Sequence, residues 1–301
     1  MLSNRLNYIL LSIVAIVLSV AIHSCTGVAA TADNSVMVSI EPLRGIAQRI
    51  AGDGFEVATL MESGANPETF EPSMSKRMQL ERARSFIVTG LLPFEQTLVN
   101  DGDLSAVSVI DVSQGIDLIY GTHENLHAAH GEHSEHGHAD CGSADPHIWM
   151  SLRNLVTIAR NIAAGLSEID PEHAADYQAR GEALVAELQE ADNKAAALVS
   201  TARVKSFAVW HPSLSYFARD YGLEQIPVGS ETKEASVGRL RGVIDEAVAD
   251  SVRVFFFQRE YDTRQAQSVC ERIGSRMVTI DVQSSNIVEQ LSRIADELAH
   301  H

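Results

Sequence analysis

Short runs of β-branched and apolar residues alternate with stretches of helical periodicity in the first third of the chain. After the first run, Leu43, Ile46 and Ile50 mark one face of a helix. Alternation of strands and helices is typical of a parallel sheet covered by helices. The predicted strands of this group are VMVSI (36–40), EVATL (56–60), SFIVTG (85–90) and AVSVID (106–111).

The same alternation returns near the end of the chain, after a long helical pattern over 170–202 that no proline interrupts. Pro171 suits the start of this helix, with Asp170 as its cap. We therefore predict an α/β protein with two lobes, each a parallel-type sheet with flanking helices, joined by one rigid helix. The N-terminal lobe covers 35–169 and the C-terminal lobe 203–301; a single large α/β domain is the alternative. The predicted strands of the second group are SFAVW (206–210), QIPVG (225–229), VRVFFF (252–257) and RMVTID (276–281).

Composition limits the classes of function. Of the 301 residues, 45% are hydrophobic, which is enough to bury a sizeable core. The formal net charge of −17 argues against a nucleic-acid partner, because binding to phosphates needs clustered lysine and arginine. An acidic surface suits a soluble protein that meets cations.

The N-terminus is typical of an export signal. After Arg5, the stretch YILLSIVAIVLSVAI (8–22) carries no charge. This stretch is shorter than a membrane span, which needs about 20 residues, but it is long enough for a signal peptide. We predict a lipoprotein-type signal peptide over 1–24, with lipid attached to Cys25. Cleavage after Ala30 and a permanent anchor helix are the alternatives. All three place the folded part in the periplasm or at the cell surface.

A histidine-rich segment interrupts the first group of elements, in a loop predicted over 121–145. The segment HENLHAAHGEHSEHGH has almost no apolar framework, so we expect it to be mobile and to bind several metal ions weakly. It would act as a collector or sensor of metal; a solvated insert with incidental metal affinity is the alternative. We expect Cys141 in this loop and Cys270 to be free thiols. The secondary metal ligands are His123, His127, His130, His133, His136 and His138.

Four further side chains are candidate ligands of one tighter metal site. Ligands of open α/β sheets bind beyond the carboxyl ends of strands. There His211 follows 206–210, Asp281 is the last residue of 276–281, and Glu68 lies in the loop after 56–60, while His147 in DPHIW precedes a predicted helix. Each residue alone is better explained as a cap, a turn or a solvated group. Together, two imidazoles and two carboxylates can bind Zn(II), and they also suit Mn(II) or Fe(II).

Other residues near these positions receive weaker predictions. Glu260 is the alternative fourth ligand to Asp281. Three acidic residues are expected to cap helices or to orient ligands, and two aromatic residues to exclude water or to fill the core. These residues are Glu71, Asp145, Glu231, Trp149 and Trp210.

Several motifs together cover most of the chain after residue 35. They include GANPETFEPSMS, DPHIWMSLRNL, FAVWHPSLSYFARDYGLEQIPV and MVTIDVQSS. In these motifs the chain resembles the solute-binding proteins of bacterial zinc and manganese ABC transporters, many of which are lipoproteins. The resemblance implies metal ligands at His147, His211 and Asp281. The family pattern is GANPH where this chain has GANPE, so Glu68 would bind through oxygen. A histidine at 211 and a His-rich loop favour zinc, with manganese or iron as the alternative.

The resemblance implies capture of a divalent metal and its delivery to an ABC permease in the inner membrane. We expect a monomer held at the membrane by its lipid, with no nucleic-acid partner. We do not expect an enzyme, because H-E-x-x-H and G-x-S-x-G are absent from the sequence and four protein ligands leave no open position for water. A zinc hydrolase and a surface adhesin are the alternatives from other classes.

Overall fold

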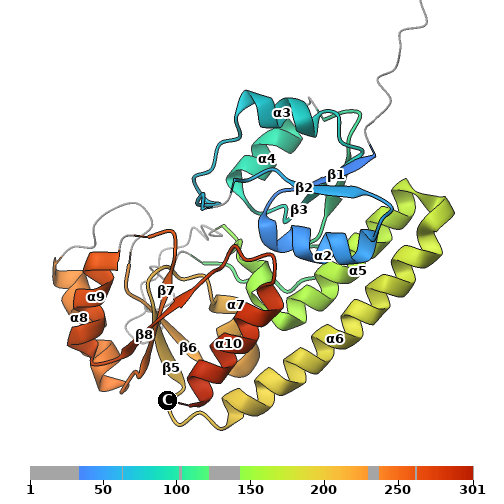
Figure 1. The fold of residues 1–301 in the computed structure, drawn as a ribbon. Coiled ribbons are helices and arrows are strands. Elements are labelled where there is room, and N and C mark those ends of the chain that lie inside the picture. The colour runs from blue at the N-terminus through green and yellow to red at the C-terminus, as the bar shows by residue number, and fades with distance from the viewer. Residues whose placement is uncertain are drawn as a thin grey trace, which may run out of the picture. The chain divides into compact units, whose positions relative to one another are not determined.

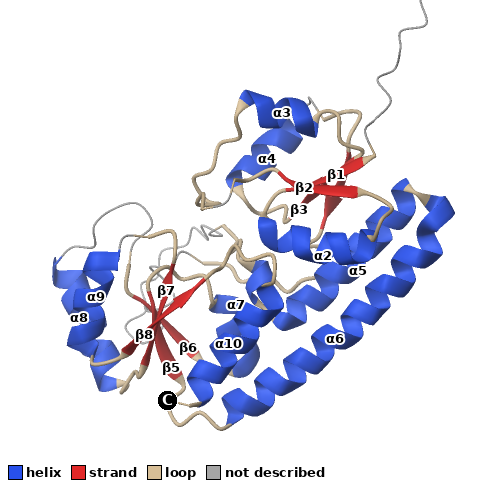
Figure 2. Ribbon diagram, viewed as in Figure 1, coloured by secondary structure: helices blue, strands red, loops and turns tan. Residues whose placement is uncertain are grey.

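The computed structural model describes residues 34–62, 64–101, 104–121, 143–229, 237–261 and 263–300. Two four-stranded sheets form its framework, and every pair of neighbouring strands is parallel (Figures 1 and 2). All eight predicted strand runs overlap an observed strand. The first sheet has the order β2-β1-β3-β4, with β1 (Ser35–Val38), β2 (Glu56–Thr59), β3 (Ser85–Val88) and β4 (Ser108–Asp111). The second has the order β6-β5-β7-β8, with β5 (Ser206–Val209), β6 (Glu224–Pro227), β7 (Val254–Gln258) and β8 (Arg276–Ile280).

Helices separate most of the strands along the chain, as the crossovers of parallel sheets require. The helix predicted after the His-rich loop is α5, which Ser151 caps by accepting a hydrogen bond from the Asn154 backbone N–H at 3.0 Å. The helices other than the longest are α2 (Glu41–Ala51), α3 (Met74–Leu80), α4 (Pro93–Asn100), α5 (Leu152–Ile169), α7 (Ser215–Tyr221), α8 (Val237–Ala249), α9 (Thr263–Ile273) and α10 (Ile287–Ala299), with 3-10 turns η3 (Ile148–Met150) and η4 (Pro171–His173).

The longest helix is α6 (Ala174–Ser200), which follows η4 and runs beside α5 (Figure 1). It links the two sheets and confirms the long helix predicted from the sequence. A side chain on Gly181 would bring its Cβ within 2.8 Å of the Ala163 Cβ, so glycine allows α6 to pack closely on α5. Both sheets belong to one compact unit, Asn34–His301. The lobe boundaries therefore stay a prediction.

One large hydrophobic core extends through α5, α6 and α10 and takes side chains from both sheets. The strands of the second sheet alternate between two cores, as the pleat dictates. Phe207 and Phe256 belong to the large core, whereas Ala208 and Phe255 belong to a smaller core with residues of α8 and α9. The two sheets are thus joined by packed side chains as well as by a helix.

The loop after β8 rests against elements of the first half of the chain. A Cβ on Gly45 of α2 would lie 1.9 Å from the carbonyl oxygen of Ser285, so only glycine fits there without movement of the loop. In addition, Trp149 of η3 donates its indole N–H to the carbonyl of Val282 at 2.9 Å. These two contacts fix the segment that follows Asp281.

Several predictions fall outside the described residues: the signal segment 1–24, Cys25, the six loop histidines and Cys141. Among the residues that the structure does describe, none of the helices combines the length and apolar character of a membrane span. Cys270 on α9 is a buried free thiol, as predicted. Burial raises the pKa of this thiol.

Candidate metal centre

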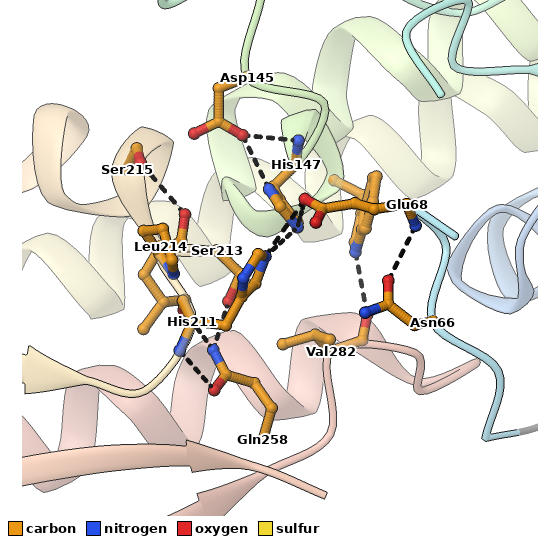
Figure 3. A network of polar contacts seen from close by, with 12 residues as sticks. Asn66, Glu68, Asp145, His147, His211, Ser213, Leu214, Ser215, Gln258 and Val282 are labelled. Atoms are coloured by element: carbon orange, nitrogen blue, oxygen red, sulfur yellow. Dashed lines mark hydrogen bonds and ion pairs between the residues drawn. The ribbon is translucent and has the colours of Figure 1, made fainter. Parts of the chain in front are cut away.

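Three of the four predicted ligands converge on one point. The Nε2 atoms of His147 and His211 lie 3.3 Å apart. The Oε1 atom of Glu68 lies 3.3 Å from Nε2 of His211 and 3.8 Å from Nε2 of His147. Figure 3 shows the three side chains pointing toward one another. Both histidines are buried, while the Glu68 side chain remains 16% exposed.

This arrangement fits a tetrahedrally bound metal ion. Zinc binds histidine nitrogen and carboxylate oxygen at about 2.0–2.2 Å, which places tetrahedral ligand atoms roughly 3.3 Å apart. The three observed separations of 3.3, 3.3 and 3.8 Å therefore match one face of such a tetrahedron. Two imidazole nitrogens with one carboxylate oxygen suit Zn(II), and also Mn(II) or Fe(II).

Asp145 orients His147. Its Oδ1 lies 2.8 Å from the Nδ1 of the His147 ring and also accepts the His147 backbone N–H at 2.9 Å. A hydrogen on Nδ1 leaves Nε2 as the lone-pair donor that faces the cluster. Burial would raise the pKa of Asp145, but its hydrogen bonds with the side chain and the backbone of His147 hold the pKa below its ordinary value.

His211 is held from the end of β7. The buried Gln258 accepts the His211 backbone N–H at 3.1 Å and donates to the His211 carbonyl at 2.5 Å. A second bond from Gln258, at 2.9 Å, reaches the Ser213 hydroxyl. The ring of Tyr261 stacks on the imidazole, with centroids 5.7 Å apart and planes 24° apart. Sequence reasoning missed Gln258 and Tyr261, although both follow the carboxyl end of a predicted strand.

Glu68 lies in the loop between β2 and α3. The side-chain oxygen of Asn66 accepts the Glu68 backbone N–H at 2.9 Å, which fixes the local turn (Figure 3). Just before it, Gly64 has a φ of +83°, a conformation that favours glycine. Sequence reasoning also missed Asn66.

Asp281, the fourth predicted ligand, does not join the cluster. Its Oδ2 pairs with the Arg259 guanidinium at 2.8 Å, and its Oδ1 accepts the Gln283 backbone N–H at 3.1 Å. In the part of the chain that the structure describes, the groups close enough to share a metal are those of Glu68, His147 and His211. The assignment of Asp281 as a ligand stays a prediction.

Some of the weaker candidates lie near this centre and others lie away from it. Glu260 is partly buried, and burial raises the pKa of its carboxyl group, which also lies in the fields of His211 and Asp281. The Trp149 ring packs beside His147, with centroids 5.2 Å apart. Away from the cluster, Glu71 is exposed. Trp210 packs against Phe257, and Glu231 lies outside the described residues.

A comparison with protein families shows which family the chain belongs to. Residues 36–295 match the family model described as zinc-uptake complex component A, periplasmic, or ZnuA. The chain belongs to this family. This confirms the resemblance to metal-binding proteins of ABC transporters.

Two curated relatives illustrate the similarity to the ZnuA family. The zinc-binding protein AdcA of Streptococcus pyogenes serotype M3 is 25% identical over 285 residues, covering 90% of this chain and 55% of AdcA. The chain thus spans about half the length of the AdcA relatives that it matches. The high-affinity zinc uptake system protein ZnuA of Bacillus subtilis is 27% identical over 264 residues, covering 86% of this chain and 79% of that protein.

Solved structures agree on the fold. A crystal structure of ZnuA superposes with a TM-score of 0.78 at 28% identity, covering 89% of this chain and 98% of that one. A Zn(II)-bound AdcAII variant of Streptococcus pneumoniae gives a TM-score of 0.75 at 24% identity, covering 89% and 99%. The predicted fold class, two parallel sheets linked by a long helix, is therefore confirmed.

Proposed function

We propose that this protein captures Zn(II) outside the cytoplasm and delivers it to an ABC permease in the inner membrane. The observation that carries the proposal is the convergence of Glu68, His147 and His211 within bonding range of one ion. The family description and the names of the AdcA and ZnuA relatives support zinc as the cargo. Mn(II) or Fe(II) is the alternative cargo, because a carboxylate oxygen also suits these harder ions.

Asp281 completes the proposed site as its fourth ligand. The Asp281 carboxylate would exchange its ion pair with the Arg259 guanidinium, at 2.8 Å, for a bond to the dication. In the absence of metal, the ion pair would keep this carboxylate charged and close to the site. With Glu68, Asp281 would supply two negative charges that neutralise the ion in the site. Glu260 is the alternative fourth ligand, because its partly buried carboxyl group belongs to the loop that follows β7, next to Tyr261.

Four protein ligands favour binding over catalysis. A catalytic zinc keeps one position open for water, whereas a closed shell holds the ion without activating a nucleophile. We therefore propose a binding protein rather than a hydrolase. Exchange of a metal-bound water, measured on the loaded protein, would favour the enzyme instead.

Release would come from movement of a loop rather than from a wide hinge. The core shared by both sheets resists a large tilt between them. The proposed carboxylate ligands are the exposed ones, at 16% for the Glu68 side chain and 28% for Asp281, and both lie in loops. The Glu68 loop, which no helix or strand holds, can therefore move without opening the core.

The remaining parts of the proposal concern delivery. Lipid on Cys25 would tether a monomer to the membrane beside its permease, in the periplasm or at the cell surface. The six loop histidines at 123, 127, 130, 133, 136 and 138 would collect additional ions weakly and raise their local concentration near the tight site.

Metal analysis of protein purified without added metal, followed by competition titration with zinc and manganese, tests the proposal. His147→Ala and His211→Ala should each lower zinc affinity at least ~10-fold. Even the loss of a residue that only orients a metal ligand lowers affinity on that scale. His173→Ala is the control, because that exposed histidine pairs with Asp170 away from the site and should bind zinc normally. Wild-type affinity in both ligand variants would refute the site.

A further inference from the structure

Tyr261 connects the loop of one proposed ligand with the side chain of another. Its ring stacks on the His211 imidazole at 5.7 Å between centroids. The Tyr261 hydroxyl accepts a hydrogen bond from the side-chain amide of Asn66 at 3.3 Å. Asn66, in turn, accepts the backbone N–H of Glu68 at 2.9 Å. A chain of contacts therefore runs from His211 to Glu68 beside the metal position without passing through it.

We infer that Tyr261 is a positioning residue that couples the two ligand-bearing loops and slows the escape of the metal. The inference rests on the proposed metal site and adds a residue to it. One ligand, His211, is already fixed by Gln258 on its backbone. The Tyr261 hydroxyl extends that fixed region to the loop that carries Glu68.

The loop of Glu68 needs such an external contact. No helix or strand occurs over 64–73, so backbone ladders do not hold this segment. The Asn66 side chain serves both sides at once, with its oxygen on Glu68 and its nitrogen on Tyr261. Loss of the tyrosine hydroxyl would leave the local turn intact but would weaken its connection to the end of β7. The less firmly held loop would carry Glu68 away from the ion more often.

This role affects dissociation more than association. Encounter of a metal ion with the site depends on charge and access, which loss of the half-buried Tyr261 hydroxyl does not set, and affinity changes within one site lie mostly in the dissociation rate. Tyr261→Phe removes the hydroxyl and keeps the stacking ring. We expect zinc to leave this variant ~3- to 10-fold faster, the size of effect that one net hydrogen bond produces.

A double-mutant cycle on the full chain tests the coupling. Zinc dissociation into a chelator is followed for the wild type, Tyr261→Phe, Asn66→Ala and the double variant. Asn66→Ala should release zinc at least as fast as Tyr261→Phe, because it removes both bonds of Asn66. The double variant should match Asn66→Ala within about a factor of two, since the hydroxyl then has no Asn66 partner to lose.

Tyr221→Phe is the matched control. Its hydroxyl donates to Asp192 on α6 at 2.7 Å, and its ring contacts Phe217 and Arg153, none of which is one of the four proposed ligands. This variant should release zinc at the wild-type rate, and a shift in melting temperature without a change in rate is the signature of a purely structural hydroxyl.

Multiplied effects in the double variant, or a wild-type rate in Tyr261→Phe, would overturn the inference while leaving the proposed function standing. If Tyr261→Phe does not fold, Asn66→Ala can still overturn the inference, because an unchanged rate there shows that this chain of contacts does not slow release. Failure of the wild type to bind zinc at all would instead refute the proposed function.

Discussion

A fully buried polar side chain ends or follows the third strand along the chain in each sheet: Gln258 is the last residue of β7, and Glu95 lies on α4 after β3. The two side chains have different partners. Near the end of β3, Glu95 accepts the Thr89 backbone N–H at 2.9 Å, the Thr89 hydroxyl at 2.6 Å and the Leu92 N–H at 3.2 Å. All of these partners lie within six residues of it. At the end of β7, Gln258 instead bonds to His211, 47 residues away. The same strand order thus supports a local helix start in one sheet and a binding loop in the other.

The comparison extends to how each proposed ligand is held. A neutral amide that belongs to a strand holds the backbone of His211. His147 and Glu68 depend on the side chains of Asp145 and Asn66, which come from loops. We infer that His211, held by the second sheet, is the rigid part of the site and that the loops of His147 and Glu68 adjust to the ion.

Replacing Gln258 should have the largest effect. Gln258→Leu leaves the backbone N–H and carbonyl of His211 and the Ser213 hydroxyl without this partner, and each buried polar group left unpaired costs about 1–3 kcal/mol. We expect the free energy of unfolding to fall by about 3 kcal/mol or more, which corresponds to roughly 10 °C in melting temperature. Thermal unfolding followed by circular dichroism measures this. Gln178→Leu, at an exposed position, is the control. Equal melting temperatures in the two variants would contradict the claim that Gln258 makes this part of the site rigid.

Asp145→Asn should affect metal binding more than stability. The amide keeps the shape of the carboxylate but loses the charge that fixes the His147 tautomer, so zinc affinity at pH 7 should fall about 10- to 100-fold. Because the folded-state pKa of Asp145 is lowered, its stabilising charge is fully present above the ordinary value of about 3.9 and is lost as pH falls through the lowered pKa.

The chain offers a close control for this change. Asp170 and His173 form a second pair at the same 2.8 Å separation, but His173 is exposed. Asp170→Asn should leave zinc affinity in a competition titration unchanged. If both asparagine variants bind zinc alike, the charge of Asp145 does not orient the ligand.

Glu95→Gln should produce the smallest effect on the metal site, and its distinctive result is a change in how stability depends on pH. Burial raises the pKa of Glu95 above its unfolded value, so the folded state binds the proton more tightly. The resulting stability is present below pH about 4.3 and is lost as pH rises through the folded pKa. Urea unfolding between pH 4.5 and 8 should show the free energy of unfolding of the wild type falling with rising pH relative to that of Glu95→Gln. Parallel pH profiles for the two proteins would contradict this.

Periodicity predicted the strands and the long helix because each follows from local alternation of apolar residues. Placement at strand ends, together with the motif resemblance, predicted Glu68, His147 and His211, which the structure brings together. Asp281 stays outside the cluster because Arg259, 22 residues earlier and past the end of the neighbouring strand, pairs with its carboxylate. No residue pattern signals such a pairing. Gln258 and Asn66 were missed for a related reason: they act on the backbones of loops, which residue type does not reveal.

The position of Trp149 gives the molecule its own optical label. The chain has two tryptophans, and Trp149 is the fully buried one, beside His147 and with its indole N–H fixed on the Val282 carbonyl. A dication bound at His147 would change the electric field across this rigid ring and hence its emission. With Trp210 replaced by phenylalanine, ultraviolet fluorescence would report occupancy of the site from a single residue, without any attached dye.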